Sequence, residues 1–324
     1  MKRFLGFFLS LILLAGLAGC GGETAPTQPL ATDPVPVTTP APTEETLDVP
    51  QTEAAPTQGT EAEETYVEEE PQGYTTEAQE LVNNENLVFA VTGFRENAHM
   101  GLEMQVTCEN KSDKDMLFAL NHVSVCGIMF DPLWAEEVSA GKQVNSTVYF
   151  DTYALEEMGI TTLDEISFRL SAIDNVNWMD DPFLDEAYTL YPTGLDAASV
   201  QYPQHQDRHG QTVVVDNDKL LFIIEKVDDA ESDTYTLYCY AENRTDKDLL
   251  ISWDGVSVNG FMVDPFWASG IAAGKQLYSQ ISFYRSDLEA QGIETVSGID
   301  FTLSAIDYDS YETVLEENCA FQPK

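Results

Sequence analysis

Basic residues are scarce in this chain of 324 residues. Lys and Arg together number 15, whereas Asp and Glu number 56, so the formal net charge at pH 7 is −41. A surface with this charge repels phosphate backbones and anionic lipid headgroups, which argues against nucleic-acid binding and against lying flat on an anionic membrane. Strong acidity is typical of soluble extracellular surfaces and permits cationic partners. The sequence therefore predicts no nucleic-acid partner.

The residue types that carry common enzyme and metal chemistry are not arranged in recognisable motifs. The cysteines show no CxxC spacing, which disfavours a zinc site, and no serine stands in a GxSxG setting. His205 and His209 have helical i, i+4 spacing, but they lie beside Pro203 and Gly210 without the Glu of a HExxH site. We predict that the chain is not an enzyme and that it binds no metal or cofactor.

A hydrophobic run opens the chain. A short basic start precedes residues 4–18, which are almost all apolar or small, a run too short for a stop-transfer helix but typical of a signal peptide. It ends at Leu17-Ala18-Gly19-Cys20, which resembles a bacterial lipobox, where the Cys thiol is acylated and the chain is cut before it. We predict a signal peptide over 1–19 and a fatty-acyl anchor, palmitate included, on Cys20 that holds the protein on the extracytoplasmic face of the cell membrane. The alternative is a membrane-spanning helix followed by an ordinary cysteine.

The segment after the predicted cleavage site cannot build a hydrophobic core. Residues 21–79 are rich in Thr, Pro, Glu and Ala and contain no Lys or Arg. Such a composition repels itself and buries little apolar surface, so we predict a disordered acidic stalk over 20–79. The alternative to a solvated stalk is a segment that carries glycans or binds a partner.

The rest of the chain is an internal duplication. Residues 80–190 and 213–323 align at a constant shift of 133 without a gap, and about a third of the positions match. Each copy is long enough to bury its own core. We predict two domains, 80–192 and 213–324, joined by a linker over 193–212 that is either loose or docked.

The periodicity inside each copy is that of β-strands. Apolar and polar residues alternate over 102–108 and again over 235–241, and the same pattern recurs at 144–150 and 277–283. Alternation places one face of each strand inward and the other in water, which favours seven or eight short antiparallel strands per copy. One helix is predicted over Asp287 to Gln291.

Local signals mark the ends of these elements. Ser286 can cap the helix together with Glu289, and Gly292 can end it. Asn259-Gly260 is a strong signal for a two-residue hairpin, because both residues tolerate positive φ. Cys126 stands where the second copy has Asn259, so we expect the first turn to be strained or differently shaped.

Several turn motifs carry a family resemblance. The Glu-Asn-(Lys/Arg)-(Ser/Thr)-Asp-Lys-Asp loop at 109–115 and 242–248, the Val-Asn-Gly hairpin at 258–260 and the repeated Ala-Gly-Lys step resemble immunoglobulin-like domains of unknown function from lipoproteins of Gram-positive bacteria. The resemblance implies an all-β chain of two tandem immunoglobulin-like antiparallel sandwiches, each with one short helix. The family has no established catalytic residues.

An exported chain could use disulfides. Cys108 lies on an inward strand face and Cys126 at a hairpin tip, so we expect no bridge between them. Cys239 and Cys319 both lie on predicted strands whose neighbouring residues are expected to face the core. A bridge between the two cysteines therefore stays open.

The duplicated tryptophans are the candidate ligand-binding residues. Trp134 and Trp267 each follow an Asp-Pro turn, which begins at Asp131 in the first copy and at Asp264 in the second. Exposed aromatics in such loops can anchor a ligand. A Trp in a long loop can instead close the end of the core, with its indole nitrogen bonded nearby. Both interpretations stay open at this point.

Other polar residues are not candidates for a duplicated site. His99 and His122 face Ser232 and Gly255 in the second copy. An acidic group near the end of the first copy lacks the Gly and terminal Glu of a calcium loop, and we interpret it as a solvated edge. Its members are Asp174, Asp180, Asp181, Asp185 and Glu186.

These observations favour a membrane-anchored lipoprotein that displays two binding or structural modules, for adhesion or contact with an unknown protein or glycan of the envelope or host. The alternative is a ligand-binding lipoprotein that serves a transporter or sensor, which requires a cleft between the repeats. A cell-wall enzyme needs paired carboxylates across a groove or an activated nucleophile, and neither is recognisable.

Overall fold

A computed structural model describes residues 73–75, 77–97, 101–230 and 233–323. The predicted signal peptide, Cys20, His99 and nearly all of the predicted stalk lie outside these residues. No helix within the described part of the chain is long and apolar enough to cross a membrane.

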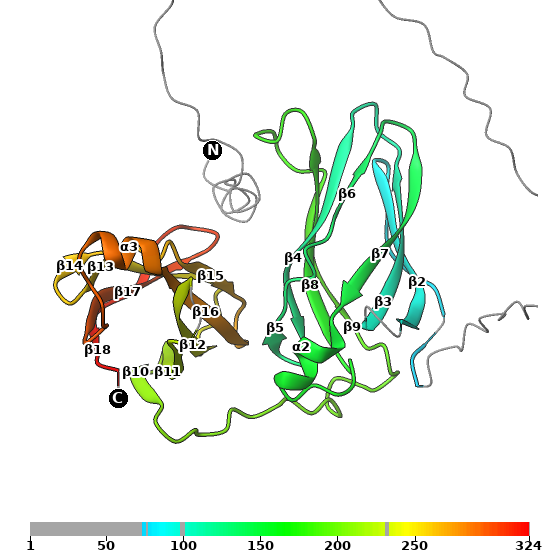
Figure 1. Ribbon diagram of the computed structural model, residues 1–324. Helices are drawn as coiled ribbons and strands as arrows, with labels where there is room; N and C mark the ends of the chain where they lie inside the picture. The colour runs from blue at the N-terminus through cyan, green and yellow to red at the C-terminus, as the bar shows by residue number, and fades with distance from the viewer. Residues whose placement is uncertain (1–72, 76, 98–100, 231–232, 324) are drawn as a thin grey trace, which may run out of the picture. The chain divides into compact units, whose positions relative to one another are not determined.

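The first repeat consists of two sheets and one short helix (Figure 1). One sheet has the order β1-β2-β3-β7, and the strands are β1 (Gln79–Asn83), β2 (Leu87–Asn97), β3 (Gly101–Asn110) and β7 (Gln143–Phe150). In the second sheet β4 pairs with β5, β6 and β8, and β8 pairs with β9. These strands are β4 (Met116–Val125), β5 (Ile128–Met129), β6 (Ala135–Val138), β8 (Ile166–Asp174) and β9 (Leu184–Leu190). Helix α2 (Thr152–Glu157) follows β7.

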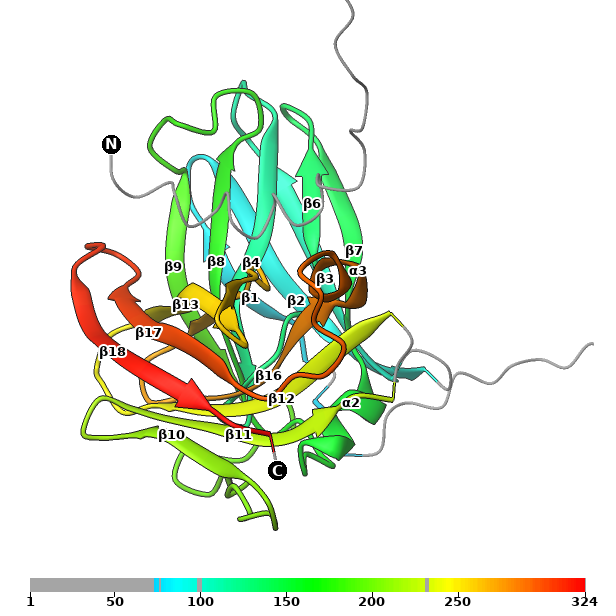
Figure 2. The same ribbon diagram turned by 60° about the vertical axis from the view of Figure 1, so that its left-hand side comes forward.

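The second repeat has the same order of elements (Figure 2). Its first sheet is β10-β11-β12-β16, formed by β10 (Thr212–Asp216), β11 (Leu220–Asp228), β12 (Thr234–Asn243) and β16 (Gln276–Tyr284). Its second sheet is β14-β13-β17-β18, with β15 also paired to β13. These strands are β13 (Leu249–Val258), β14 (Phe261–Met262), β15 (Ala268–Ile271), β17 (Ile299–Asp307) and β18 (Thr313–Phe321). Helix α3 (Arg285–Ala290) follows β16.

The strand pairing within each repeat is that of an immunoglobulin-like Greek key. In the second repeat, β11, β12 and β16 are neighbours in one sheet, and β13, β17 and β18 are neighbours in the other. These two groups correspond to strands A-B-E and C-F-G of the immunoglobulin sandwich. The first repeat pairs β2-β3-β7 and β4-β8-β9 in the same way. The predicted all-β sandwich class is therefore confirmed.

Each repeat has its own hydrophobic core, formed by the inward faces of its strands. The predicted alternation is present in β7, where Val148 and Phe150 are buried and Tyr149 between them is exposed. The first core includes Phe89 and Phe118, and the second includes Phe222. Each repeat has nine strands in the described residues, more than the seven or eight predicted, because β5 and β14 are two-residue returns from a hairpin that alternation cannot detect.

The two hairpin turns have the same shape. Asn259 and Gly260 have φ values of 52° and 85°, and Cys126 and Gly127 have 45° and 83°. Positive φ at both central residues is the type I′ signature. The expected strain at Cys126 is therefore borne out in its left-handed backbone, whereas the expected difference in shape is not.

The predicted cap of the second helix is wrong. Tyr284 is the N-cap of α3 and makes no side-chain capping bond, so Ser286 lies inside the helix. The end of the helix is as predicted, because Gly292 has φ of +74° and its N–H donates to the Glu289 carbonyl at 2.9 Å. In α2 the Asp151 carboxylate accepts bonds from the N–H groups of Tyr153 and Ala154.

A buried asparagine organises the same loop in each repeat. The Asn243 Nδ2 donates to the carbonyls of Lys247 and Ile271 at 2.7 and 3.0 Å, and its Oδ1 accepts from Thr245 at 2.7 Å. Asn110 makes the matching bonds to Lys114 and Val138 in the first repeat. These side chains satisfy buried carbonyls that would otherwise lack partners.

We predict that Asn243→Ala lowers the free energy of unfolding by about 2–4 kcal/mol, because it leaves several buried backbone groups without partners. Chemical denaturation with a linear extrapolation measures the change. Asn318→Ala is the control, since this side chain is exposed and accepts a bond from the Thr302 hydroxyl. Equal losses from the two substitutions would contradict the role assigned to Asn243.

Candidate functional site

Trp134 is part of the first core, and Trp267 is partly buried against the second. The indole Nε1 of Trp134 donates to the Ser146 Oγ at 3.1 Å, and that of Trp267 donates to the Ser279 Oγ at 3.0 Å. Trp134 packs edge-on against Phe89 at 6.2 Å between ring centroids. A packed ring with a bonded indole nitrogen supports the core interpretation. Ligand binding at Trp134 or Trp267 stays a prediction; Trp134 is buried and Trp267 is half-buried.

The exposed apolar group of each loop is the residue before the tryptophan. Leu133 is 79% exposed and Phe266 is 86% exposed, and their φ values are 50° and 49°. A non-glycine residue in the left-handed region is strained by about 1–2 kcal/mol. Asp131 and Asp264 stabilise this conformation, because their Oδ1 atoms accept the N–H of Leu133 at 2.9 Å and of Phe266 at 2.7 Å. The two aspartates therefore shape the loop backbone.

A second candidate site is the junction between the two repeats. The residues shared by the two copies do not predict it. Ile128 of β5 forms a parallel bridge with Gln276 of β16. The Gln276 N–H donates to the Gly127 carbonyl at 2.9 Å, and the sheet then runs through nine strands that belong to both repeats. Met129 packs against the second core, and its sulfur accepts the Ala272 N–H at 3.4 Å.

A buried carboxylate strengthens this junction. Glu165 of the first repeat is 4% exposed, and its Oε1 lies 2.9 Å from the Lys275 Nζ of the second repeat. Its other oxygen accepts the Tyr202 hydroxyl at 2.5 Å. Burial, with a smaller contribution from this bond to Glu165, raises the pKa of Tyr202. A buried carboxylate needs such partners, because burial without them is costly.

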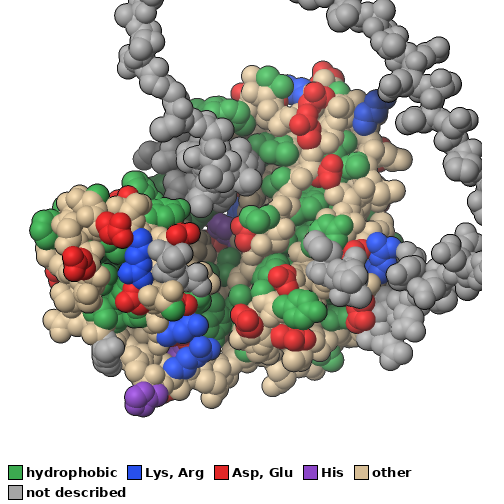
Figure 3. Space-filling view, in the orientation of Figure 1, with side chains coloured by type: hydrophobic (Ala, Val, Ile, Leu, Met, Phe, Trp, Pro, Cys, Tyr) green, Lys and Arg blue, Asp and Glu red, His purple; other side chains and the backbone are tan. Residues whose placement is uncertain are grey.

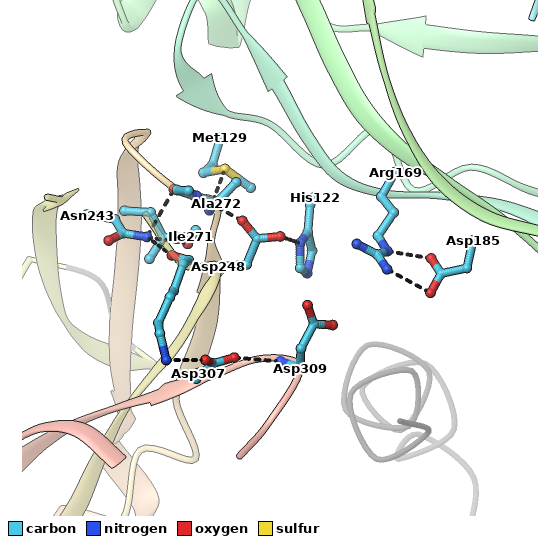
Figure 4. Close-up of polar contacts among 12 residues, drawn as sticks. His122, Met129, Arg169, Asp185, Asn243, Asp248, Ile271, Ala272, Asp307 and Asp309 are labelled. Atoms are coloured by element: carbon cyan, nitrogen blue, oxygen red, sulfur yellow. Dashed lines mark hydrogen bonds and ion pairs between the residues drawn. The ribbon is translucent and has the colours of Figure 1, made fainter. Parts of the chain in front are cut away.

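His122 forms a further polar contact across the junction (Figure 4). Its Nδ1 lies 3.1 Å from the Asp248 Oδ2, and its ring packs edge-on against Tyr308 at 4.3 Å between centroids. The hydrogen bond from His122 lowers the pKa of Asp248, and the Ala273 N–H adds to that effect. The His122 Nε2 is buried and makes no hydrogen bond. The ring contact with Tyr308 therefore adds to the single hydrogen bond that orients His122.

The linker is docked rather than loose. The Gln276 Nε2 donates to the Pro203 carbonyl at 3.2 Å. His205 stacks on Tyr240 at 4.1 Å between ring centroids, and its Nε2 lies 3.0 Å from the Glu225 Oε1. The second histidine of the i, i+4 pair, His209, is exposed. His205 therefore serves to dock the linker on the second repeat.

The acidic group of the first repeat is partly structural. Asp174 is 4% exposed, accepts bonds from Val176 and Asn177, and lies 2.7 Å from the Lys114 Nζ. The interpretation as a solvated edge is therefore wrong for Asp174, whereas Asp180 is 60% exposed. Asp174 also recurs as Asp307, which pairs with Lys247 at 2.6 Å. Both lysines hold the pKa of their aspartate below its usual range, to about 2 for Asp307.

The bridge left open between Cys239 and Cys319 is not formed. Cys108, Cys126, Cys239 and Cys319 are all free thiols. Cys239 lies on β12 and Cys319 on β18, in opposite sheets of the second repeat. Across the described ranges, no group of three or more His, Cys, Asp or Glu side chains could hold a metal ion.

We predict that Lys275→Ala lowers the free energy of unfolding by about 2 kcal/mol, because it leaves the buried Glu165 carboxylate without its cation. Calorimetry should show the second repeat unfolding at a lower temperature. Lys142→Ala is the matched control, because Lys142 occupies the corresponding position in the first repeat and is exposed. Similar changes for both variants would contradict the role of Lys275 at the junction.

We also predict an acid-dependent loss of stability. A carboxyl with a lowered pKa stabilises the fold fully above its ordinary pKa of 3.8, and this contribution is lost as the pH falls toward about 2 for Asp307. Melting temperatures between pH 5 and pH 2 should fall, and Lys247→Met should flatten that part of the curve. An unchanged slope relative to a Lys142→Met control would show that the pair with Asp307 is not responsible.

No protein-family model matches the sequence, and no curated protein matches it. Among solved structures, the chain is similar to a Salmonella enterica pilin in complex with its chaperone, with 9% identity over 73% of this chain and 97% of that one and a TM-score of 0.23. It is also similar to a protein of unknown function from Porphyromonas gingivalis W83, with 12% identity over 76% of this chain and 99% of that one and a TM-score of 0.18. The fold assignment rests on the strand pairing described above.

Proposed function

We propose that this chain is an extracytoplasmic lipoprotein of a Gram-positive bacterium that displays two coupled immunoglobulin-like modules for adhesion or envelope contact. The lipobox-like segment that ends at Cys20 and the acidic stalk support an anchored, projecting protein. The turn motifs shared with Gram-positive lipoproteins support the source. No catalytic residue, metal or cofactor is part of the proposal.

The observation that carries the binding role is the repeated exposed apolar residue. Leu133 and Phe266 project from backbones with positive φ, a conformation that costs stability and is nevertheless present in both copies. A large apolar side chain held outside the core is a common anchor in protein recognition. Acidic side chains are spread over the face in Figure 3 among hydrophobic ones, so a partner with cationic groups would complement that face.

The alternative, a ligand-binding lipoprotein for a transporter or sensor, needs a polar cleft between the repeats. At the described junction His122 packs on Tyr308 and Met129 packs against the second core, and these contacts favour display over ligand capture. An open depression in the second repeat is lined by residues without charged side chains, which would give a charged solute few partners. Its lining is Gln211, Thr212, Val213, Ala320, Gln322 and Pro323.

Substitution of the loop residues tests the proposal. We predict that the double variant Leu133→Ser, Phe266→Ser reduces binding of the displayed protein to isolated cell-wall, glycan and host-matrix fractions by about tenfold or more. Its melting temperature should stay about the same, because both side chains are exposed and Ser keeps the Cβ that strains the backbone. Binding to the fractions is measured by pull-down with the protein on its membrane.

Two controls complete the experiment. Val176→Ser changes an apolar side chain of similar exposure, 73%, outside these loops and should leave binding unchanged. Cys20→Ser should release the protein from the membrane fraction without changing the loops. Binding that survives the double variant, or no binding to any fraction by the parent protein, would contradict the adhesion role.

A further inference from the structure

Each repeat has one sheet that does not take part in the junction. The sheet β1-β2-β3-β7 has four strands and ends at β7, and the sheet that contains β13, β14, β15, β17 and β18 has five. The nine-stranded sheet is formed from the same two kinds of sheet, a four-stranded one of the second repeat and a five-stranded one of the first. The described residues thus contain one contact between a four-stranded and a five-stranded sheet. They also contain one further sheet of each kind that makes no such contact.

The tip of the β13–β14 hairpin in the second repeat is the counterpart of the β4–β5 tip that forms the junction. At the shift of 133, Gly127 corresponds to Gly260 and Met129 to Met262. Both turns have the left-handed backbone described above, so the Gly260 carbonyl belongs to the same hairpin geometry as the Gly127 carbonyl. The backbone acceptor and the methionine of the junction are therefore present again at the end of the second repeat.

The exposure of the two tips differs. Ile128 is fully buried in the first core and Met129 packs against the second core, whereas their counterparts Phe261 and Met262 are 49% and 68% exposed. Burying both side chains would remove apolar surface from water and stabilise a contact. A pair of adjacent large apolar side chains on a short strand at a sheet edge is a surface that association can cover.

The receiving edge is also duplicated. The segment Ala273-Gly274-Lys275-Gln276, which meets the first tip, recurs as Ala140-Gly141-Lys142-Gln143. Gln143 begins β7, where it pairs with Glu109 of β3, as Gln276 pairs with Glu242 of β12. Because Gln276 directs its N–H away from β12 to Gly127, the same register directs the Gln143 N–H away from β3. Gln143 is exposed, and β7 is the last strand of its sheet.

We propose that the β13–β14 hairpin of one chain docks on the β7 edge of a second copy, in the geometry by which β5 docks on β16 within the chain. The four-stranded and five-stranded sheets of neighbouring copies then form another nine-stranded sheet. Such a contact joins different surfaces of the two copies, so it repeats in a head-to-tail row instead of closing as a symmetric dimer.

Differences between the copies set the strength of this contact. The shift of 133 places Gly298 at the position of Glu165 and Gly255 at that of His122, so the counterparts of the Glu165–Lys275 and His122–Asp248 contacts are missing. The contact between copies is therefore weaker than the internal junction. Anchoring at a membrane surface raises the local concentration that such a contact needs, although the docking geometry does not depend on the anchor.

Disulfide trapping tests the geometry in the full-length protein on cells. Ile128 and Gln276 are register partners, and paired strands lie about 4.8 Å apart, a distance that a disulfide can span. Chains with Phe261→Cys and chains with Gln143→Cys are expressed together and treated with a mild oxidant, with Cys319→Ser in every variant. We expect at least tenfold more crosslinked dimer from the mixture than from either variant alone, on non-reducing gels.

The same gels show whether the docking proposal is wrong. An absence of crosslinked dimer in the mixture overturns the proposal, as does equal crosslinking of Phe261→Cys with itself. Adding Met262→Asp to the Phe261→Cys chain should reduce the dimer by about tenfold, because it places a charge in the contact. Val176→Asp, on another exposed apolar residue, should leave the dimer unchanged.

A substitution that strengthens the contact between copies provides a second, independent test. A Cβ added at Gly298 would meet nothing closer than 3.9 Å, and the φ of this residue is outside the left-handed region, so Gly298→Glu fits the fold. This carboxylate stands where Glu165 stands in the internal junction and can pair with Lys142 of the next copy. We expect Gly298→Glu to increase the trapped dimer and Lys142→Glu to cancel that increase. No change from Gly298→Glu, with its melting temperature preserved, counts against the proposed geometry.

Discussion

The hydrogen bond between the Gly127 carbonyl and the Gln276 amide is the contact on which the arrangement of the repeats depends. It pairs the tip of one sandwich with the open edge of the other, so a strand edge that would otherwise be unprotected is covered within the chain. Two side-chain pairs supply further polar contacts across the same interface, Glu165 with Lys275 and His122 with Asp248. The repeats are coupled because a sheet, rather than a flexible linker alone, connects them.

Much of the fold follows from local sequence patterns. The shift of 133 predicts the duplication, alternation along segments such as 144–150 predicts the strands, and Asn259-Gly260 predicts a hairpin that is present. These features are set by neighbouring residues, so a single sequence contains the information. The helix cap shows the limit, because Ser286 satisfies the capping pattern but the helix already begins at Arg285.

The candidate sites were less predictable, because recurrence marks what each domain needs and not what joins the domains. His122 and Glu165 have no counterpart of the same type in the second copy, and both lie at the junction. Differences between the copies would have been the better signal for the interface. Leu133 and Phe266 were missed for another reason, since alternation cannot identify a left-handed residue whose side chain leaves the core. The composition of the acidic group does not distinguish Asp174 from a solvated edge, whereas its recurrence as Asp307 marks a structural pair.

Amide hydrogen exchange at two equivalent positions tests the coupling of the repeats most directly. The Gln276 N–H is bonded across the junction, whereas the Gln143 N–H is at the open edge of β7. In dilute protein, where chains are separate, Gln276 should exchange about a hundredfold more slowly than Gln143, because its exchange requires opening of the junction. Equal exchange rates at Gln276 and Gln143 would contradict the continuous sheet between the repeats.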